Sequence, residues 1–207
     1  MAENQVVCIV DDDRAVRDSM LMMLKTAGQA VKAFASAEEF LNEFVPDETA
    51  CLILDVRMPG KSGLELQELL NSRETRVPVI FVSGHGDVPV SVRAIKGGAL
   101  DFLEKPFSRE TLLRRVGEAL EIAARRRVDE QDRQELLQRF DKLTPREREV
   151  LIHVVAGRQN KNIAKLLDIS HRTVELHRTR MMEKMSARSL PELVAIAVRC
   201  GVHEINA

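Results

Sequence analysis

The stretch VVCIVDDD at residues 6–13 decides how the first half of the chain folds. Five apolar residues in a row, followed by charge, are typical of a strand buried on both faces of a parallel sheet. Short apolar runs of this kind recur four more times before residue 104. The expected strands are Val6–Val10, Val31–Phe34, Cys51–Leu54, Val79–Val82 and Phe102–Leu103.

Helix-forming stretches separate these runs. Ser36–Glu39 and Ser62–Glu65 each place a hydroxyl three residues before a carboxylate, which is the spacing of a capping box. Alternating strands and helices predict an α/β doubly wound fold with a five-stranded parallel sheet and right-handed crossovers. Ligands bind beyond the carboxyl ends of such strands, so chemistry is expected at that edge.

Polar side chains gather at the expected ends of four strands. Two carboxylates about 4 Å apart repel by about 4 kcal/mol at an effective dielectric of ~20, and a divalent cation between them removes this cost. Oxygen ligands suit Mg²⁺, and a metal, a hydroxyl and an ammonium could together hold a phosphoryl group on a carboxylate. Taken singly, each residue is better explained as part of a solvated turn or as a surface residue, and it is the joint pattern at four strand ends in this order that favours the site. The set is Asp11, Asp12, Asp13, Asp55, Ser83 and Lys105.

From Leu143 onward the sequence predicts only helices. Thr144, Pro145 and Glu147 form a strong helix start, and Gly157 ends that helix. A short helix at 160–167, a three-residue connection and a second helix capped by Ser170 have helix-turn-helix geometry. A final helix is expected over 189–200. An ordinary helical bundle with a charged outer face would explain the same spacing.

On the second of these helices, Val174, Met181 and Met185 fall on one face and are expected to pack inward. The other side mixes cations, polar groups and one apolar residue, a composition suited to phosphates and base edges. Its members are Arg172, Thr173, Glu175, Leu176, His177, Arg178, Thr179 and Arg180.

Charge is unevenly divided along the chain. Residues 1–120 hold 14 Lys and Arg against 19 Asp and Glu, whereas residues 141–207 hold 12 against 8 and four of the five His. The basic C-terminal part favours a nucleic-acid contact, although a solvated surface gives the same excess. Aromatic residues are 3%, without Trp or Tyr, which argues against stacking single-stranded bases.

The sequence also predicts where the protein is located and whether its cysteines are reduced. The N-terminus lacks a basic, apolar leader, and no apolar run is long enough to span a bilayer, so we expect a cytoplasmic protein with no membrane partner. Cys8 and Cys51 lie inside apolar runs and are expected to be buried and reduced. Residues 121–140 contain helix formers and no Gly or Pro, which predicts a helical linker.

The motifs of the first half resemble the receiver domain of two-component response regulators, and most closely the FixJ subfamily. The resemblance covers residues 5–122. Its motifs are Asp11-Asp12, LDVRMPG at 54–60, SGHGDVP at 83–89 and FLEKPF at 102–107. In this family the fold is flavodoxin-like, and the domain catalyses only its own phosphoryl transfer and slow autodephosphorylation, so no further enzyme activity is expected.

The resemblance implies a role for each motif residue. Asp55 would be phosphorylated by a sensor histidine kinase, with Mg²⁺ as cofactor held by Asp11, Asp12, Asp55 and the backbone carbonyl of Arg57. Lys105 would contact the phosphoryl group, and its peptide bond to Pro106 is expected to be cis.

The resemblance also implies expectations for five residues around this site. Ser83 and Phe102 would act as the switch, with Phe102 turning inward when Ser83 moves; a plain core role for Phe102 stays open. Arg57 and His85 would flank the phosphoryl group, and Asp13 is expected to face solvent.

Residues 141–200 resemble the LuxR-type helix-turn-helix, on the segments LTPREREVL, NKNIAKLLDIS, HRTVELHRTRMMEKM and SLPELV. By this resemblance the helix at 171–184 enters the major groove of promoter double-stranded DNA, and Ser189–Cys200 pairs two subunits. Glu175, Leu176 and Thr179 would face bases. Lys161, Arg172, Thr173 and His177 would contact phosphates.

The resulting prediction has three parts: a receiver at 1–122, a helical linker at 123–140 and a DNA-binding domain at 141–207. Phosphorylation would produce a homodimer that binds DNA and regulates transcription, with RNA polymerase as a partner and activation as the family tendency. One alternative is an aspartyl-phosphate phosphatase with Asp11 as nucleophile, but that motif expects Thr or Val where Ala15 stands. The other is an output domain that binds RNA or protein.

Overall fold

The computed structural model describes residues 5–73, 75–84 and 88–202. The chain divides into two compact units after Arg126. The division falls inside the expected linker, and the boundaries 1–122, 123–140 and 141–207 stay predictions. None of the described helices is both long enough and apolar enough to cross a membrane.

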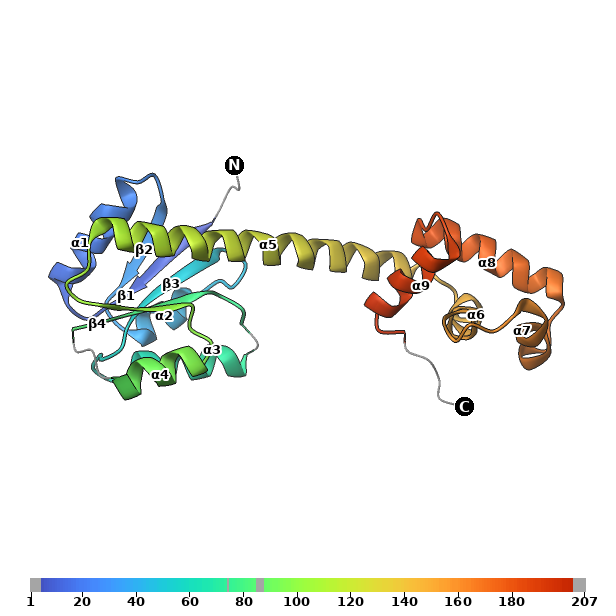
Figure 1. Cartoon of the computed structure of the whole chain (residues 1–207), viewed down its shortest axis with the longest axis horizontal. Coiled ribbons are helices and arrows are strands. Elements are labelled where there is room, and N and C mark those ends of the chain that lie inside the picture. The colour runs from blue at the N-terminus through green and yellow to red at the C-terminus, as the bar shows by residue number, and fades with distance from the viewer. Residues whose placement is uncertain (1–4, 74, 85–87, 203–207) are drawn as a thin grey trace. The chain divides into compact units, whose positions relative to one another are not determined.

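The N-terminal unit is built on a five-stranded parallel sheet, as predicted (Figure 1). The strand order is β2-β1-β3-β4-β5, so the direction of winding reverses between β1 and β3. In open parallel sheets, ligands bind beyond the carboxyl ends of the strands at this point of reversal. Each expected apolar run lies within one strand. The strands are β1 Val6–Val10, β2 Ala30–Phe34, β3 Thr49–Asp55, β4 Val79–Ser83 and β5 Asp101–Glu104.

Helices cover both faces of this sheet, because alternate strand residues point to opposite sides. Cys8, Leu52 and Phe81 belong to the core on one face, and Ile9 and Cys51 to the core on the other. Both cysteines are buried as expected, and burial raises the pKa of each thiol, so both stay protonated. The helices are α1 Arg14–Lys25, α2 Ala37–Glu43, α3 Gly63–Ser72, α4 Val88–Lys96 and α5 Arg109–Asp141.

One expected helix start needs correction, and another has a capping residue that was not expected. Ser36 Oγ accepts from the Glu39 N–H, but the Glu39 carboxylate accepts from the N–H of Ala35, so the expected capping box is only half formed. Asp13 is exposed, as expected, yet its carboxylate also caps α1 by accepting from the N–H groups of Ala15 and Val16. At Ser62 and Glu65 the predicted box is complete.

The C-terminal unit contains the end of α5 and four further helices (Figure 1). Its core includes Val174, Met181 and Met185, all fully buried as predicted. Phe140, in the last turn of α5, packs against this core. Residues 121–140 are helical, as expected, because they lie within α5, a continuous helix of 33 residues. The four helices are α6 Pro145–Val155, α7 Asn160–Leu167, α8 His171–Met185 and α9 Leu190–Arg199.

A buried carboxylate joins α6 to α8. Glu147 is 2% exposed, and its Oε2 accepts from the Thr144 N–H at 2.8 Å and from Lys184 Nζ at 2.7 Å. Burial pushes the pKa of Glu147 upward, but these hydrogen bonds outweigh burial and leave the pKa below its ordinary value. Local capping and long-range packing thus depend on one side chain.

Replacing Lys184 by Met should destabilise the C-terminal unit by about 1–3 kcal/mol, because a buried acceptor loses its charged donor. The wild-type contribution is fully present above the unfolded-state pKa of Glu147 and is lost as the pH falls through its lower folded-state pKa. Thermal unfolding of the full chain from pH 7 to pH 3 measures both effects. Lys165→Met, at an exposed lysine on α7, is the control; equal losses in both variants would contradict the assignment.

Candidate functional site

The carboxyl ends of the strands bring three predicted residues into direct contact. Lys105 Nζ lies 2.7 Å from Asp11 Oδ2 and 2.8 Å from Asp55 Oδ1. Asp11 is fully buried and Asp55 is 7% exposed. Ser83 is also buried at the end of β4, and its carbonyl oxygen accepts from the Lys105 N–H at 2.7 Å. Lys105 therefore contacts two carboxylates that lie 94 and 50 positions before it in the chain.

The backbone orients both carboxylates toward the same point. The Asp13 N–H donates to Asp11 Oδ1 at 2.9 Å, and the Arg57 N–H donates to Asp55 Oδ2 at 3.0 Å. The remaining oxygen of each carboxylate is the one that contacts Lys105. One oxygen of each pair is thus fixed by the loop after its strand, and the other is presented to a cation.

The pKa shifts follow from this arrangement. Burial raises the pKa of Asp55 above its ordinary value, and the hydrogen bond from Lys105 opposes the rise only in part. Burial alone would lower the pKa of Lys105, but its hydrogen bonds to Asp11 and Asp55 raise it above the ordinary value. The ammonium therefore remains charged and partly compensates two crowded carboxylates.

The expected magnesium ligands are only partly gathered. Asp11 and Asp55 converge, whereas Asp12 is exposed at the start of the following loop. Within the described ranges, no three Asp, Glu, His or Cys side chains form a group that could hold a metal ion. The two convergent carboxylates are the hard oxygen ligands that Mg²⁺ prefers, so the donor chemistry fits, and the full ligand set stays a prediction.

The expected switch and flanking residues have mixed outcomes. Phe102 is half-buried, and its ring centroid lies 6.5 Å from that of Phe81 in a stacked arrangement. The Lys105-Pro106 peptide bond is cis, as predicted. Arg57 is exposed beside Asp55, and His85 lies outside the described residues.

Gly63 is a site residue that sequence reasoning missed. It is the first residue of α3, and its N–H donates to the carbonyl oxygen of Val56 at 3.1 Å. A Cβ atom at this position would lie 2.1 Å from the backbone oxygen of Asp55. Only glycine lets α3 begin against the backbone of Asp55. A glycine inside the Ser62–Glu65 capping motif was the available signal.

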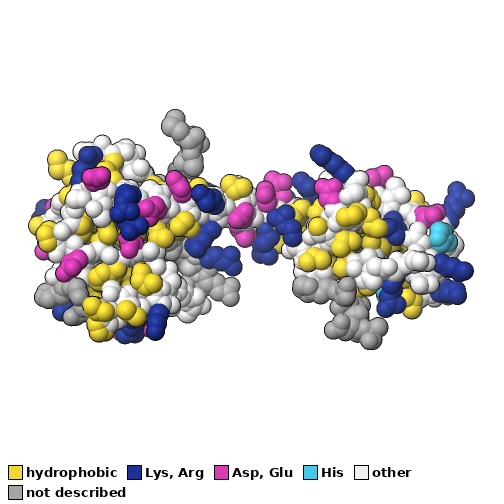
Figure 2. All heavy atoms as spheres, viewed as in Figure 1, with side chains coloured by type: hydrophobic (Ala, Val, Ile, Leu, Met, Phe, Trp, Pro, Cys, Tyr) yellow, Lys and Arg dark blue, Asp and Glu magenta, His cyan; other side chains and the backbone are white. Residues whose placement is uncertain are grey.

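The exposed side of α8 contains most of the expected DNA-contacting residues. Arg172, Glu175, Leu176 and Thr179 are exposed, as is Lys161 on α7. Figure 2 shows Lys and Arg side chains around the end of this unit where α7 and α8 lie. The surface therefore offers cations next to a polar and apolar strip, which suits a duplex groove.

Three other residues on α8 are less available than the sequence indicated. Thr173 Oγ1 lies 2.8 Å from Ser170 Oγ, and its N–H donates to that same oxygen. His177 Nδ1 is buried without a hydrogen-bond partner, so a phosphate contact would have to use Nε2. Arg178, expected on the outer side, is half-buried and donates to Asn160 Oδ1.

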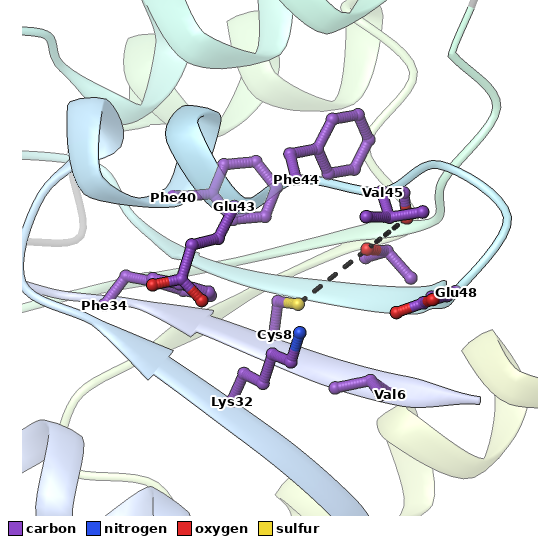
Figure 3. A pocket seen from close by; sticks show the side chains of 10 residues that line it. Val6, Cys8, Lys32, Phe34, Phe40, Glu43, Phe44, Val45 and Glu48 are labelled. Carbon is purple, nitrogen blue, oxygen red and sulfur yellow. Dashed lines mark hydrogen bonds between the residues drawn. The ribbon is translucent and has the colours of Figure 1, made fainter. Parts of the chain in front are cut away.

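A small pocket lies near the opposite ends of β1 and β3 (Figure 3). Cys8 Sγ and Thr49 Oγ1 are 3.9 Å apart on its floor, and the Thr49 hydroxyl donates to the Val45 carbonyl oxygen. Phe40 and Phe44 form part of its wall. The pocket contains none of Asp11, Asp55, Ser83 and Lys105, which together form the acidic edge of the sheet, so it does not belong to that site.

Comparison with known proteins covers both units. Residues 7–117 match the family described as response regulator receiver domain. Residues 141–197 match the family described as bacterial regulatory proteins, luxR family.

Full-length relatives and solved structures agree. The transcriptional regulatory protein FixJ of Azorhizobium caulinodans is 47% identical over 98% of this chain and 96% of its own length. Nodulation protein W of Bradyrhizobium diazoefficiens is 42% identical over 95% and 87%. The low-resolution structure of the response regulator StyR has a TM-score of 0.83 at 41% identity, covering 95% of this chain and 99% of that one.

Substituting Gly63 by Ala should destabilise the N-terminal unit by more than about 1 kcal/mol, because the added methyl group pushes the start of α3 away from the backbone of Asp55. The same displacement should slow any reaction at the Asp55 side chain. Gly117→Ala is the matched control, since its Cβ in α5 meets nothing within 4 Å. That change should stabilise the chain by about 0.5–1 kcal/mol through helix propensity. Denaturant unfolding of both variants tests the contrast, and a stabilised Gly63→Ala would refute it.

Proposed function

We infer the function from the family to which this chain belongs, the two-component response regulators with a LuxR-type DNA-binding domain. The relatives are transcriptional regulators rather than enzymes, and this chain is a transcriptional regulator with the same two domains. We propose that Asp55 accepts a phosphoryl group from a sensor histidine kinase. The observation that carries the proposal is the convergence of Asp11 and Asp55 on Lys105 at 2.7 and 2.8 Å.

The proposed chemistry uses the groups of the acidic edge. Asp55 Oδ1 would attack the phosphorus atom carried by the kinase histidine, and the bond between phosphorus and the histidine nitrogen would break, so that the histidine leaves. Lys105 would then contact the phosphoryl oxygens instead of this carboxylate oxygen. Receiver domains bind Mg²⁺ at the phosphorylation site, where the ion supplies charge neutralisation. Here Asp11, Asp12, Asp55 and the Arg57 carbonyl would hold it. Arg57 and His85 would flank the group and set how fast it is lost.

The proposed switch connects this edge to pairing of two chains. Ser83 would move toward the phosphoryl group, and Phe102 would turn inward behind it. Going from mostly inactive to mostly active needs roughly 5 kcal/mol of preference for the active form. Contacts of the phosphoryl group and a new interface would supply it together. The exposed apolar residues Val88, Val92 and Ile95 on α4 support pairing through that helix.

The proposed output is binding of a homodimer to promoter double-stranded DNA. The helix at 171–184 would enter the major groove, with Glu175, Leu176 and Thr179 facing bases. Phosphate contacts would come from Lys161, Arg172, Thr173 and His177. Helix α9 would pair the two DNA-binding domains, and exposed Leu190 and Val198 support this. Activation through contact with RNA polymerase is the expected result.

The phosphatase alternative is disfavoured by the position of Asp13. In that mechanism Asp13 would work beside Asp11 as a second catalytic acid. Its carboxylate instead caps α1, accepting from the Ala15 N–H at 2.8 Å. Asp55, Ser83 and the C-terminal domain would also have no role.

The variant Asp55→Asn should incorporate no phosphoryl group from acetyl phosphate, because the amide cannot act as the nucleophile. Phosphate-affinity electrophoresis and intact mass measure the product. Beryllofluoride should shift wild type toward dimer in size-exclusion chromatography and leave this variant unchanged. Asp47→Asn, at an exposed loop residue, is the control, and equal labelling of both variants would exclude Asp55 as the acceptor.

The variant Thr179→Ala should change sequence preference at one base step by about 1–3 kcal/mol. Thr179 is exposed, and its hydroxyl donates to the Glu175 carbonyl oxygen within α8, so both lone pairs of the hydroxyl oxygen remain available to accept a hydrogen bond from a base. Selection of bound duplexes from a random library compares variant and wild type. An unchanged binding profile would remove Thr179 from the base-contacting set.

A further inference from the structure

Helix α7 has little of its own to hold it in place. It has eight residues, and its N-cap residue Gln159 makes no side-chain capping hydrogen bond. A helix this short is unstable in isolation, so its position must come from tertiary contacts. Only Ile163 and Ala164 on it are buried. Side chains from the neighbouring helices must therefore fix where its two ends lie.

Two arginines hold the two ends of α7. At the C-terminal end, Arg146 of α6 donates to the carbonyl oxygen of Leu167 and pairs with Glu149 at 2.5 Å. At the N-terminal end, Arg178 of α8 donates from Nη1 to Asn160 Oδ1 at 2.6 Å. The second contact joins the first residue of α7 directly to the helix proposed to enter the groove.

We propose that the hydrogen bond from Arg178 to Asn160 sets the position of α8 relative to α7 and so determines which base pairs the protein prefers. Arg178 is then a positioning residue that does not contact DNA. A guanidinium bound to a fixed acceptor has a defined direction, unlike a mobile surface cation. Arg178 immediately precedes Thr179 and lies one turn after Glu175 on α8.

The bond would connect two kinds of DNA contact. Lys161, next to Asn160, is a proposed phosphate contact, and phosphate contacts fix the orientation of a protein on the duplex. Glu175, Leu176 and Thr179 are the proposed base contacts. This inference rests on the proposed DNA-contacting role of α8. Loss of the bond would let α8 shift relative to α7, which moves the base-contacting residues away from their base edges. The long, flexible side chains of Lys161 and Arg172 would still reach phosphates after such a shift.

The test uses the full-length protein with beryllofluoride and a duplex that wild type selects from a random library. The measured quantities are the ratio of affinities for that duplex and a scrambled one, and the dependence of affinity on salt. Arg178→Met should lower the ratio by about tenfold, while the salt slope stays the same. Losing a phosphate contact would instead reduce the slope by about 1 and leave the ratio nearly constant.

Asn160 gives an independent arm if Arg178→Met does not fold. Asn160→Ala should lower the ratio as much as Arg178→Met does, although Ala is the better helix former, and the double variant should lose no more than either single one. Asn160→Asp keeps an oxygen acceptor and should retain the wild-type ratio. Lys165→Met, at an exposed lysine on α7 with no proposed DNA contact, is the control and should also retain the ratio.

The outcomes separate the two proposals. If wild type prefers no duplex over scrambled DNA, the proposed function fails. If wild type does discriminate, either of two results overturns the positioning role. One is that Asn160→Ala keeps the wild-type ratio of affinities. The other is that Arg178→Met reduces the salt slope as much as Arg172→Met, which removes a proposed phosphate contact.

Discussion

The ammonium of Lys105 between two buried carboxylates is the interaction on which the acidic edge depends. It contacts β1 through Asp11 and β3 through Asp55, and its backbone N–H bonds to the end of β4 at Ser83. Two carboxylates placed together at this depth are costly without a nearby cation. A group that binds Asp55 must therefore engage Lys105 or displace it. For this reason a change at the Asp55 carboxylate would alter contacts at the ends of four strands, β1, β3, β4 and β5.

The same constraint explains why Gly63 matters. Both carboxylates are held by N–H groups of the loops that follow their strands, at Asp13 and Arg57. The loop after β3 must turn tightly into α3, and a side chain at Gly63 would occupy the space of the Asp55 carbonyl group. The position of the Asp55 carboxylate is thus set by backbone packing as much as by charged side chains.

Cations have an internal role in the C-terminal unit as well. Lys184 bonds to Glu147, Arg146 to Leu167 and Arg178 to Asn160, while Arg148 lies over the Phe140 ring at 4.7 Å. Four of the 12 Lys and Arg counted over residues 141–207 are therefore engaged within the unit. The number of Lys and Arg in this part is therefore larger than the number available to contact phosphates. The exposed residues Lys161, Arg172 and Arg180 are better candidates than the composition alone could indicate.

The strands, the helix starts and the main acidic cluster could all be predicted from local patterns in the amino-acid sequence. Apolar runs predicted the five strands, capping residues such as Ser170 and Thr144 predicted the helix starts, and strand-end polarity predicted that Asp11, Asp55 and Lys105 would meet. These succeed because strand burial, helix capping and parallel pairing depend on neighbours in the chain or on one shared sheet edge. Only the tertiary structure decided that Asp13 caps α1, that Gly63 lies against Asp55 and that Arg178 binds Asn160. Each of these depends on which of several available partners a side chain or a backbone meets in space, and periodicity carries no information about that choice.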